Sequence, residues 1–485
     1  MAEKNPLIRE KAFVGGEWVS AKSGKTFEVL NPATGEVVAK VADTDAADTE
    51  AAIQRAYAAF QTWRETTSRE RAAILKRLGQ LMDENVENLA KIITAENGKK
   101  MMESTNEARG ASGFVKYFAE EATRTVGDVH TNLQKNKRAL VIRQPVGVAG
   151  LITPWNFPME MITRKAGAAL AAGCTVVIKP SEDTPLSALA LCDMMKEAGI
   201  PDGVFNVVPC SRANAPAVGK VLCESELVSK ISFTGSTATG KILLAQSAST
   251  VKKVSMELGG NSPFIVFDSA NVDAASMGCF ILKFYGSGQV CISANRILVQ
   301  EGIYDEFCQK LAKLASSLVV GNGMDPKTTL GPLINAKGLE KVERHVQNAV
   351  KNGGRLLVGG KRSELGGNFF EPTVVCDVPK EALVCSEETF GPLASIIKFK
   401  TEEEAVTIAN STRMGLAGYF YSNDIGQIWR VAERMEVGMV GVNDTFIFDN
   451  ALPFGGIKES GLGVEGSRYG LNEFQNMKVV GFGGI

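Results

Sequence analysis

The 485-residue sequence is poor in the residues that build disulfide frameworks, metal centres and histidine triads. Its nine cysteines are scattered without a C-x-x-C pair, which argues against both a disulfide framework and a cysteine zinc cluster. The only histidines, His130 and His345, lie neither in an H-x-x-x-H pattern nor beside a nucleophile elbow. These absences nearly exclude histidine triads and zinc hydrolysis, and we predict no metal site.

A charge imbalance and targeting segments are missing as well. The formal net charge is -1, so no net field favours nucleic acid or an anionic membrane. The longest apolar run, 166–178, contains two glycines and is shorter than the roughly 20 residues of a membrane span. Residues 1–13 fit neither a signal peptide nor a transit peptide. We therefore expect a cytoplasmic protein that acts on a small molecule, with neither nucleic acid nor membrane as partner.

The sequence does contain an alternation of helix and strand patterns. Apolar residues at three- and four-residue spacing predict two or three amphipathic helices between residues 43 and 98. Short β-branched runs then predict strands at 146–152, 176–178, 204–208, 230–233 and 251–256. Helix-period segments separate them, at 158–172, 184–198, 213–223 and 237–247. This order predicts a parallel sheet with helical crossovers, and a second α/β stretch begins near Asn261.

Two of the predicted strands end in segments that suit a dinucleotide. Gly235 and Ser236 lie in a turn that opens a helix near Thr237, where backbone N–H groups can hold a pyrophosphate. An ordinary βα turn is the alternative. Lys179 and Glu182 follow another strand, and the Glu182 carboxylate could take the two hydroxyls of a ribose and disfavour a 2′-phosphate. A solvated loop charge or a helix-capping acid explains Glu182 equally well.

Two further segments suit covalent chemistry. The glycines Gly286 and Gly288 precede Cys291 and free the backbone to present its thiol, although most free cysteines serve packing. Glu257 stands at a strand end before a glycine turn. A catalytic base could lie there as readily as a helix-capping or ion-paired glutamate.

Six motifs, in this order, resemble the aldehyde dehydrogenase superfamily. They are Pro154-Trp-Asn-Phe-Pro158, Phe233-Thr-Gly-Ser236, Glu257-Leu-Gly-Gly260, Gly288-Gln-Val-Cys291, Glu387-Glu-Thr-Phe-Gly-Pro392 and Pro453-Phe-Gly-Gly456. The resemblance covers essentially the whole chain. It implies an α/β fold with a Rossmann-like parallel-sheet cofactor domain, an α/β catalytic domain and a small β oligomerisation arm.

The resemblance also implies domain boundaries and assembly. The cofactor domain is expected at 1–123 and 144–256, and the catalytic domain at 257–445. Residues 446–471 return to the cofactor domain, and the arm consists of 124–143 and 472–485. An exposed strand edge in such an arm is most safely used between subunits, so we expect a homodimer or homotetramer.

The same resemblance assigns catalytic roles. Cys291, with a modestly lowered pKa, attacks the aldehyde carbon, and the amide of Asn156 with the backbone N–H of Cys291 holds the oxyanion. Glu257 activates the water that hydrolyses the thioester. Glu465 matches a second acidic position that some relatives use in proton relay, and a surface ion pair is the alternative.

NAD is the cofactor that the resemblance implies, with NADP possible. The pyrophosphate is expected near Gly235 and Ser236, and the adenosine ribose near Lys179 and Glu182. The other residues assigned to the cofactor, three in all, are Trp155, Glu388 beside the nicotinamide ribose and Phe390 next to it.

Within the superfamily, the chain resembles succinate-semialdehyde dehydrogenases most closely, with Arg164 as a carboxylate anchor or a structural salt bridge. It departs from them at Tyr285, where they have a second arginine, and at Ser293, where a second cysteine is common. Phe448 and Asp449 replace their serine-bearing stretch. A succinate-semialdehyde-like substrate is therefore expected, with a medium-chain or aromatic aldehyde as the alternative. A CoA-acylating enzyme and a non-catalytic scaffold are the other readings, against which Glu257 and the retained Cys291 and Asn156 argue.

Overall fold

The computed structural model describes residues 5–131 and 134–484, and its first large sheet has the strand order β2-β1-β9-β8-β7-β10-β11-β21. The five central strands are parallel. They are β7 (Val148–Ile152), β8 (Thr175–Lys179), β9 (Phe205–Val207), β10 (Val228–Thr234) and β11 (Lys253–Glu257). The order reverses beside β7, because β8 and β9 extend to one side and β10 and β11 to the other. Ligands of such sheets bind at the carboxyl ends of the strands near this reversal.

Four helices connect these strands, as the sequence predicts: α5 (Glu160–Ala172), α6 (Leu186–Glu197), α7 (Ala215–Glu224) and α8 (Thr237–Ser247). The α/β fold class and the predicted alternation are thus confirmed. Three strands begin later than predicted, β7 at Val148, β9 at Phe205 and β11 at Lys253. For β11 the reason is the φ of 52° at Val251, which interrupts extended backbone there.

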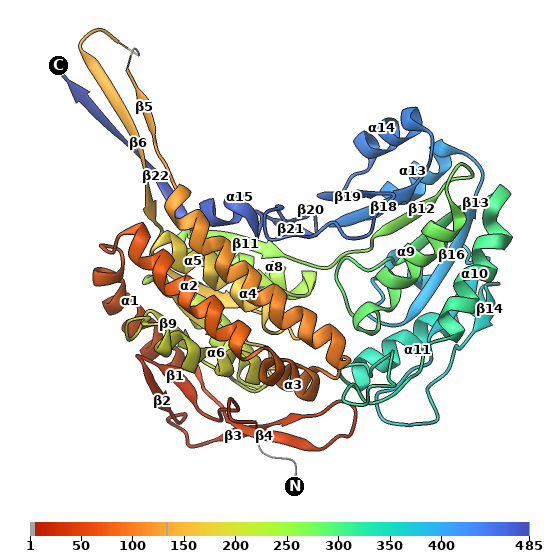
Figure 1. The fold of residues 1–485 in the computed structure, drawn as a ribbon, viewed down its shortest axis with the longest axis horizontal. Coiled ribbons are helices and arrows are strands. Elements are labelled where there is room, and N and C mark those ends of the chain that lie inside the picture. The colour runs from red at the N-terminus through yellow and green to blue at the C-terminus, as the bar shows by residue number, and fades with distance from the viewer. Residues whose placement is uncertain (1–4, 132–133, 485) are drawn as a thin grey trace.

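The N-terminal region contains four helices, of which the first packs with α7 on one face of this sheet, whereas the other three lie over α5 and α6 on the other face (Figure 1). The predicted helical stretch forms α1 (Ala46–Trp63), α2 (Ser68–Glu84) and α3 (Val86–Asn97). A fourth helix, α4 (Met101–Arg124), was not predicted; its buried Phe118 lies in the same core as Leu78 of α2 and Ile162 of α5. Two hairpins precede the helices, β1 (Ala12–Val14) with β2 (Glu17–Val19) and β3 (Thr26–Leu30) with β4 (Val37–Ala42).

The second large sheet has the order β14-β15-β16-β13-β12-β18-β19 and is parallel except at β14. Its strands are β12 (Pro263–Val266), β13 (Arg296–Gln300), β14 (Arg355–Val358), β15 (Thr373–Cys376), β16 (Leu393–Phe399), β18 (Ala417–Tyr421) and β19 (Met439–Val442). Its helices are α9 (Val272–Phe284), α10 (Tyr304–Ser316), α11 (Ala336–Lys351), α12 (Leu383–Ser386), α13 (Glu402–Asn410) and α14 (Ile425–Arg434). A small ladder pairs β17 (Met414–Gly415) with β20 (Ile457–Lys458).

The C-terminal segment returns to the first sheet and then leaves the body of the molecule. There β21 (Gly461–Leu462) pairs with β11, and α15 (Ser467–Asn472) follows. A three-stranded antiparallel arm then forms from β5 (Asp128–His130), β6 (Lys137–Pro145) and β22 (Gln475–Gly483). The arm projects away from both sheets (Figure 1). The predicted domain boundaries stay predictions.

No helix in the described ranges is long and apolar enough to cross a membrane.

Candidate functional site

The predicted site residues follow the carboxyl ends of four parallel strands of the first sheet. Asn156 follows β7, Lys179 ends β8, Ser236 follows β10 and Glu257 ends β11. Because these strands are parallel neighbours, the four ends meet along one edge, beside the reversal of strand order. The second sheet contributes Cys291 and Glu388 to the same region.

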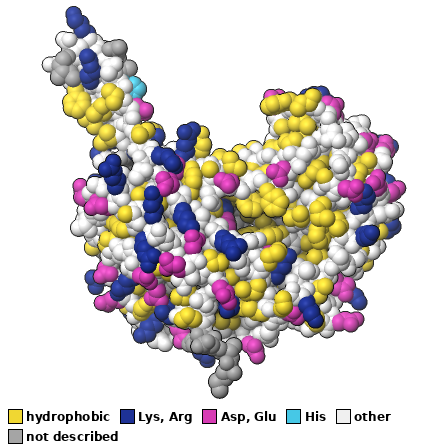
Figure 2. Space-filling model, viewed as in Figure 1, with side chains coloured by type: hydrophobic (Ala, Val, Ile, Leu, Met, Phe, Trp, Pro, Cys, Tyr) yellow, Lys and Arg dark blue, Asp and Glu magenta, His cyan; other side chains and the backbone are white. Residues whose placement is uncertain are grey.

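A cavity of about 380 Å³ opens beside Cys291. Its lining comes from α4, α5, α9 and the segment that follows β19. The predicted substrate residues Arg164, Tyr285, Phe448 and Asp449 all line it, as does Phe157. Hydrophobic side chains gather around the hollow between the two large parts of the molecule (Figure 2).

Cys291 is held at the cavity wall by a turn that depends on glycine. Gly286 and Gly288 both have positive φ values, 54° and 74°. A Cβ on Gly288 would lie 2.1 Å from the backbone oxygen of Gly391, so no larger residue fits there. Burial, followed by the charge of Glu388, raises the pKa of the Cys291 thiol to about 12. The predicted lowering of this pKa is therefore wrong, because burial and the charge of Glu388 outweigh the positive charge of Arg164, which lowers it.

Asn156 is bonded to the segment that carries Cys291. Its side-chain Nδ2 donates to the backbone oxygen of Gln289 at 3.1 Å. On the other side, the buried Lys99 Nζ donates to the Asn156 backbone oxygen at 2.6 Å, and Asn97 Nδ2 donates to the Trp155 backbone oxygen at 2.8 Å. The amide is thus fixed from two directions close to the thiol.

Glu257 is buried at the end of β11, and neither of its carboxylate oxygens has a hydrogen-bond partner among the described residues. This excludes the helix-capping and ion-paired alternatives. Burial, with the charge of Glu465 next, raises its pKa well above the ordinary value. The following glycine turn contacts the nucleophile segment, since a Cβ on Gly260 would lie 2.5 Å from the Cys291 backbone oxygen.

Glu465 forms a buried ion pair with Lys165, so the surface alternative is wrong. Ser232 Oγ donates to the same carboxylate at 3.2 Å, and Lys165 Nζ donates to Thr234 Oγ1 at 2.6 Å. Burial lowers the pKa of Lys165. Because Glu465 and Lys165 both act on the pKa of Glu257, the three groups form one electrostatic cluster behind the cavity.

The turn after β10 fits a pyrophosphate. Ser236 caps α8, its Oγ accepting from Thr239 N at 3.2 Å. The Gly235 N–H donates to the Glu257 backbone oxygen at 3.0 Å, which ties the turn to β11. A Cβ on Gly240 would lie 2.4 Å from Leu258, so glycine permits the close approach of the helix. The N-terminus of an eleven-residue helix at this edge matches the requirements of a dinucleotide phosphate.

Lys179 and Glu182 lie close to each other, 3.6 Å between Nζ and Oε2. Arg212, which the sequence analysis missed, pairs with Glu182 at 3.0 Å. Glu182 does not cap α6; Glu96 instead accepts from the backbone N–H groups of Leu186 and Ser187. The capping alternative for Glu182 is therefore wrong.

Glu388, Phe390 and Trp155 complete the set predicted for the cofactor. Glu388 accepts from the Gly260 N–H at 2.8 Å, and burial raises its pKa to about 7. The ring of Phe390 meets Trp155 edge-on, with centroids 5.9 Å apart. Partly buried acceptors, a helix N-terminus and two aromatic rings fit a nicotinamide dinucleotide.

Arg164 forms the salt bridge of the structural alternative and also lines the cavity, and its role as a carboxylate anchor stays a prediction. Its Nη2 lies 2.7 Å from Glu160, one helical turn earlier on α5. The central carbon of the guanidinium lies over two aromatic rings, 4.9 Å from the centroid of Phe114 and 4.5 Å from that of Phe454. Its Nε and Nη1 are buried without a partner among the described residues. Tyr285 stacks on Phe157, with centroids 6.3 Å apart and planes at 11°.

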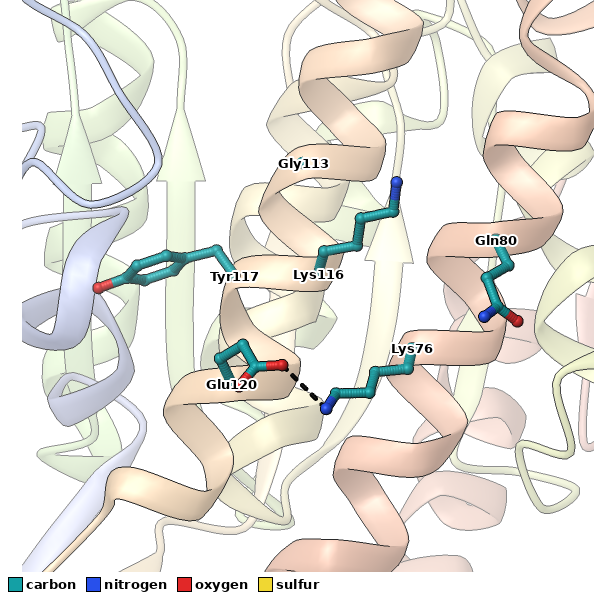
Figure 3. A pocket seen from close by; sticks show the side chains of 6 residues that line it. All are labelled: Lys76, Gln80, Gly113, Lys116, Tyr117 and Glu120. Carbon is teal, nitrogen blue, oxygen red and sulfur yellow. Dashed lines mark ion pairs between the residues drawn. The ribbon is translucent and has the colours of Figure 1, made fainter.

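A second, more open groove of about 560 Å³ lies between α2 and α4, as Figure 3 shows. Lys76 pairs with Glu120 across it at 2.9 Å, and Lys116 pairs with Asp83. Its lining contains neither a nucleophile nor any predicted site residue. The Cys291 cavity is therefore the candidate site.

In the part of the chain that the structure describes, no three His, Cys, Asp or Glu side chains are grouped to hold a metal ion.

Several residues around the cavity were missed by sequence reasoning. Lys99 and Glu107 form a buried pair at 2.5 Å, and Glu107 also accepts from the Met159 N–H at 2.9 Å. Glu160 could have been found, because it stands four residues before Arg164 in a predicted helix. Nothing in the local pattern around Lys99 marks its contact with Asn156, 57 residues away.

Comparisons with known proteins agree with these features. The model of the aldehyde dehydrogenase family matches residues 18–480. The mitochondrial succinate-semialdehyde dehydrogenase of Homo sapiens is 55% identical over 99% of this chain and 89% of its own length. The glutarate-semialdehyde dehydrogenase of Pseudomonas aeruginosa is 50% identical over 99% of both chains.

Solved structures are similar over the full length. Succinate-semialdehyde dehydrogenase from Burkholderia pseudomallei has a TM-score of 0.98 at 49% identity, covering 100% of both chains. An NADP-dependent enzyme of E. coli has a TM-score of 0.97 at 48% identity, again over 100% of both chains. Betaine aldehyde dehydrogenase from Staphylococcus aureus in complex with NAD+ has a TM-score of 0.95 at 34% identity, covering 98% of this chain and 95% of that one.

Proposed function

Because the chain belongs to the aldehyde dehydrogenase family of NAD(P)-dependent enzymes, we propose that it oxidises an aldehyde to a carboxylic acid through a thioester on Cys291. One observation carries the proposal. Cys291 lines the cavity, the Asn156 amide is bonded to the segment just before it, and the unpartnered buried carboxylate of Glu257 lies near enough for its charge to act on the Cys291 thiol.

The three residues have distinct roles in this reaction. The Cys291 sulfur attacks the carbonyl carbon and forms a thiohemiacetal. The Asn156 amide and the Cys291 backbone N–H donate to the developing oxyanion, each contributing roughly 3 kcal/mol to the transition state. Glu257 then takes a proton from the water that hydrolyses the thioester. Its freedom from hydrogen bonds and its raised pKa suit a general base near neutral pH.

We propose NAD as the cofactor, with NADP as a second acceptor. The nicotinamide of such a cofactor would supply the acceptor for the hydride that the thiohemiacetal loses. Gly235 and Ser236 would hold the pyrophosphate, Lys179 and Glu182 the adenosine ribose. Glu388, Phe390 and Trp155 would hold the nicotinamide end. Relatives are described with each form of the cofactor, NAD+ and NADP.

Two classes of aldehyde are candidates for the substrate. A succinate-semialdehyde-like substrate is favoured by the names of the relatives and by Arg164 in the cavity wall. A medium-chain or aromatic aldehyde is favoured by the aromatic lining, in which Phe157, Tyr285 and Phe448 take part.

The test of the reaction is the pair of variants Cys291→Ser and Glu257→Gln. We expect Cys291→Ser to abolish NADH formation on every aldehyde of a broad panel. Glu257→Gln is expected to lower steady-state turnover about 10²- to 10⁴-fold while one equivalent of NADH still forms rapidly, because only thioester hydrolysis is blocked. A wild-type enzyme inactive on the whole panel with either cofactor would refute the proposal.

A further inference from the structure

We infer that Glu160 determines which substrate tails the cavity accepts. By pairing with Arg164, it makes the cavity prefer aldehydes with an uncharged, apolar or aromatic tail over aldehydes that carry a carboxylate. The inference rests on the proposed function and chooses between its two substrate classes.

The first step is that Glu160 already offsets the charge of Arg164. Their side chains are 2.7 Å apart, and both are largely buried, 4% exposed for Arg164 and 13% for Glu160. A carboxylate binds a guanidinium two-pronged through Nη2 together with either Nε or Nη1. Glu160 contacts Nη2, the nitrogen that both of these edges share.

The second step is that the guanidinium is enclosed. The ring centroid of Phe114 lies 4.9 Å from the Arg164 Cζ, and that of Phe454 lies 4.5 Å from it. Both rings are close enough for cation–π contact, which helps to hold the guanidinium in place beside Glu160. Glu160 accepts from one N–H of Nη2, whereas Nε and Nη1 are buried without a partner among the described residues, so a tail carboxylate at Arg164 would share this single cation with Glu160. Two carboxylates beside one buried guanidinium leave a negative charge uncompensated, which is costly.

The third step is the charge of the cavity as a whole. Glu107 in the lining is offset by Lys99 at 2.5 Å, and Glu160 is offset by Arg164. Asp449 remains as an acid whose carboxylate accepts only from the Ala451 N–H, at 2.9 Å, among the hydrogen bonds found for it. The lining therefore carries an excess of negative charge, which repels an anionic tail.

The fourth step is the apolar surface that remains for a tail. Phe157 and Tyr285 stack on each other, and Phe446 and Phe448 lie 6.3 Å apart at the exposed end of the cavity. Aromatic rings of this kind bind apolar chains and other rings. A saturated six-carbon aldehyde and an aromatic aldehyde both suit this lining.

The experiment compares kcat/KM for succinate semialdehyde, hexanal and benzaldehyde, with NAD, in the wild type and in Glu160→Gln. We expect the wild type to prefer hexanal or benzaldehyde by about tenfold or more. Glu160→Gln should raise the ratio of succinate semialdehyde to hexanal about tenfold, chiefly through a lower KM for the semialdehyde, because the freed Arg164 then binds its carboxylate. Glu224→Gln is the matched control, since Glu224 also pairs with a base four residues away, Lys220, far from the cavity.

Three outcomes would count against the inference. A wild type that prefers succinate semialdehyde, or a Glu160→Gln variant with an unchanged ratio, would overturn it while leaving the proposed function intact. An enzyme inactive on all three aldehydes would overturn both. Should Glu160→Gln fail to fold, Asp449→Asn supplies the same measurement, with the ratio expected to move in the same direction.

Discussion

At the scale of single residues, the reactivity of Cys291 is governed by its burial. The thiol has a pKa raised to about 12, so it stays protonated through the neutral range when no cofactor is bound. The thiolate is the reacting form, and below the pKa its fraction rises tenfold per pH unit. We therefore predict that alkylation of Cys291 by iodoacetamide accelerates roughly tenfold per unit from about pH 7 to about pH 9, without a plateau.

Mass spectrometry of the Cys291 peptide measures this rate separately from the other cysteines. Cys385, the other half-buried cysteine, has a pKa raised by burial to about 11 and provides an internal comparison in the same digest. A plateau of the Cys291 rate below about pH 9 would show that a nearby positive charge outweighs burial.

The residues proposed for catalysis could be predicted from sequence because they stand in short motifs beside glycine turns. Their environments could not. The pKa of Cys291 depends on Glu388, which lies 97 positions later and is brought close only by the fold. Glu160 and Arg164 stand in one helix, but the rings that enclose the arginine come from Phe114 and Phe454. Such distant contacts leave no local pattern.

At the scale of elements, the corner between α3 and α4 supports the segment that carries Asn156. Lys99 donates to the Asn156 backbone oxygen, and Glu107 accepts from the Met159 N–H. We predict that Glu107→Gln and Lys99→Arg each lower kcat about tenfold or more with a smaller change in KM, because the Asn156 amide shifts relative to the oxyanion. Steady-state kinetics with a saturating cofactor measures both constants.

A double-mutant cycle with Asn156→Ala separates positioning from general damage. If Glu107 acts through the amide, Glu107→Gln has little further effect on kcat once that amide is removed. Equal losses in both backgrounds would assign Glu107 a purely structural role. Lys91→Met, which breaks the exposed pair with Glu87 on α3, is the control and should leave kcat unchanged.

A second prediction at this scale concerns the start of α6. Glu96 accepts from the Leu186 and Ser187 N–H groups there, and burial raises its pKa to about 8. As the pH rises from about 4.5 to about 8, the unfolded chain loses this proton before the folded protein does, so Glu96 makes the folded state progressively less stable. The loss is absent below this window and complete above it.

We therefore predict that Glu96→Gln flattens the fall of the melting temperature between about pH 5 and about pH 8, although the variant melts lower at pH 5 because the amide satisfies the N–H groups less well. Thermal melting at matched ionic strength measures this. Glu197→Gln, at the exposed end of α6, is the control and should keep the wild-type slope. Parallel curves for wild type and Glu96→Gln would contradict the prediction.

The strands and crossover helices of the first sheet were predictable because period and turn residues agree along the chain. The helix α4 was not: its buried face includes Glu103 and Glu107 along with Phe118, so its apolar stripe is interrupted by acids. Those acids are buried because Lys99 and the Gly286 and Met159 N–H groups compensate them. The residues that weaken the helical pattern are thus the ones that hold the cavity together.

At the scale of the whole molecule, the arm requires something to pack against. Its three strands leave Val129, Met477 and Val479 about two-thirds exposed or more, at 68%, 69% and 70%. Val129 is opposite Leu140, whereas Val479 is opposite Val141, one position along β6, so apolar side chains lie on both faces. Three strands exposed on both faces gain little stability alone. We propose that a second copy of the chain covers the arm.

The edge of the arm gives this proposal its test. Among the described residues, β22 pairs with β6 alone, so its other edge offers backbone N–H and C=O groups beyond Gln475 that another subunit's sheet can pair with. We predict that Val479→Asp converts the wild-type oligomer into a species of one chain mass, 51.8 kDa, because a buried unpaired carboxylate would be costly at the interface. Light scattering after size exclusion measures the mass.

Lys478→Gln, at the adjacent position on the opposite face of β22, is the control and should leave the oligomer intact. A monomeric wild type at micromolar concentration would refute the proposal, whereas a Val479→Asp variant that stays oligomeric would place the contact on another surface.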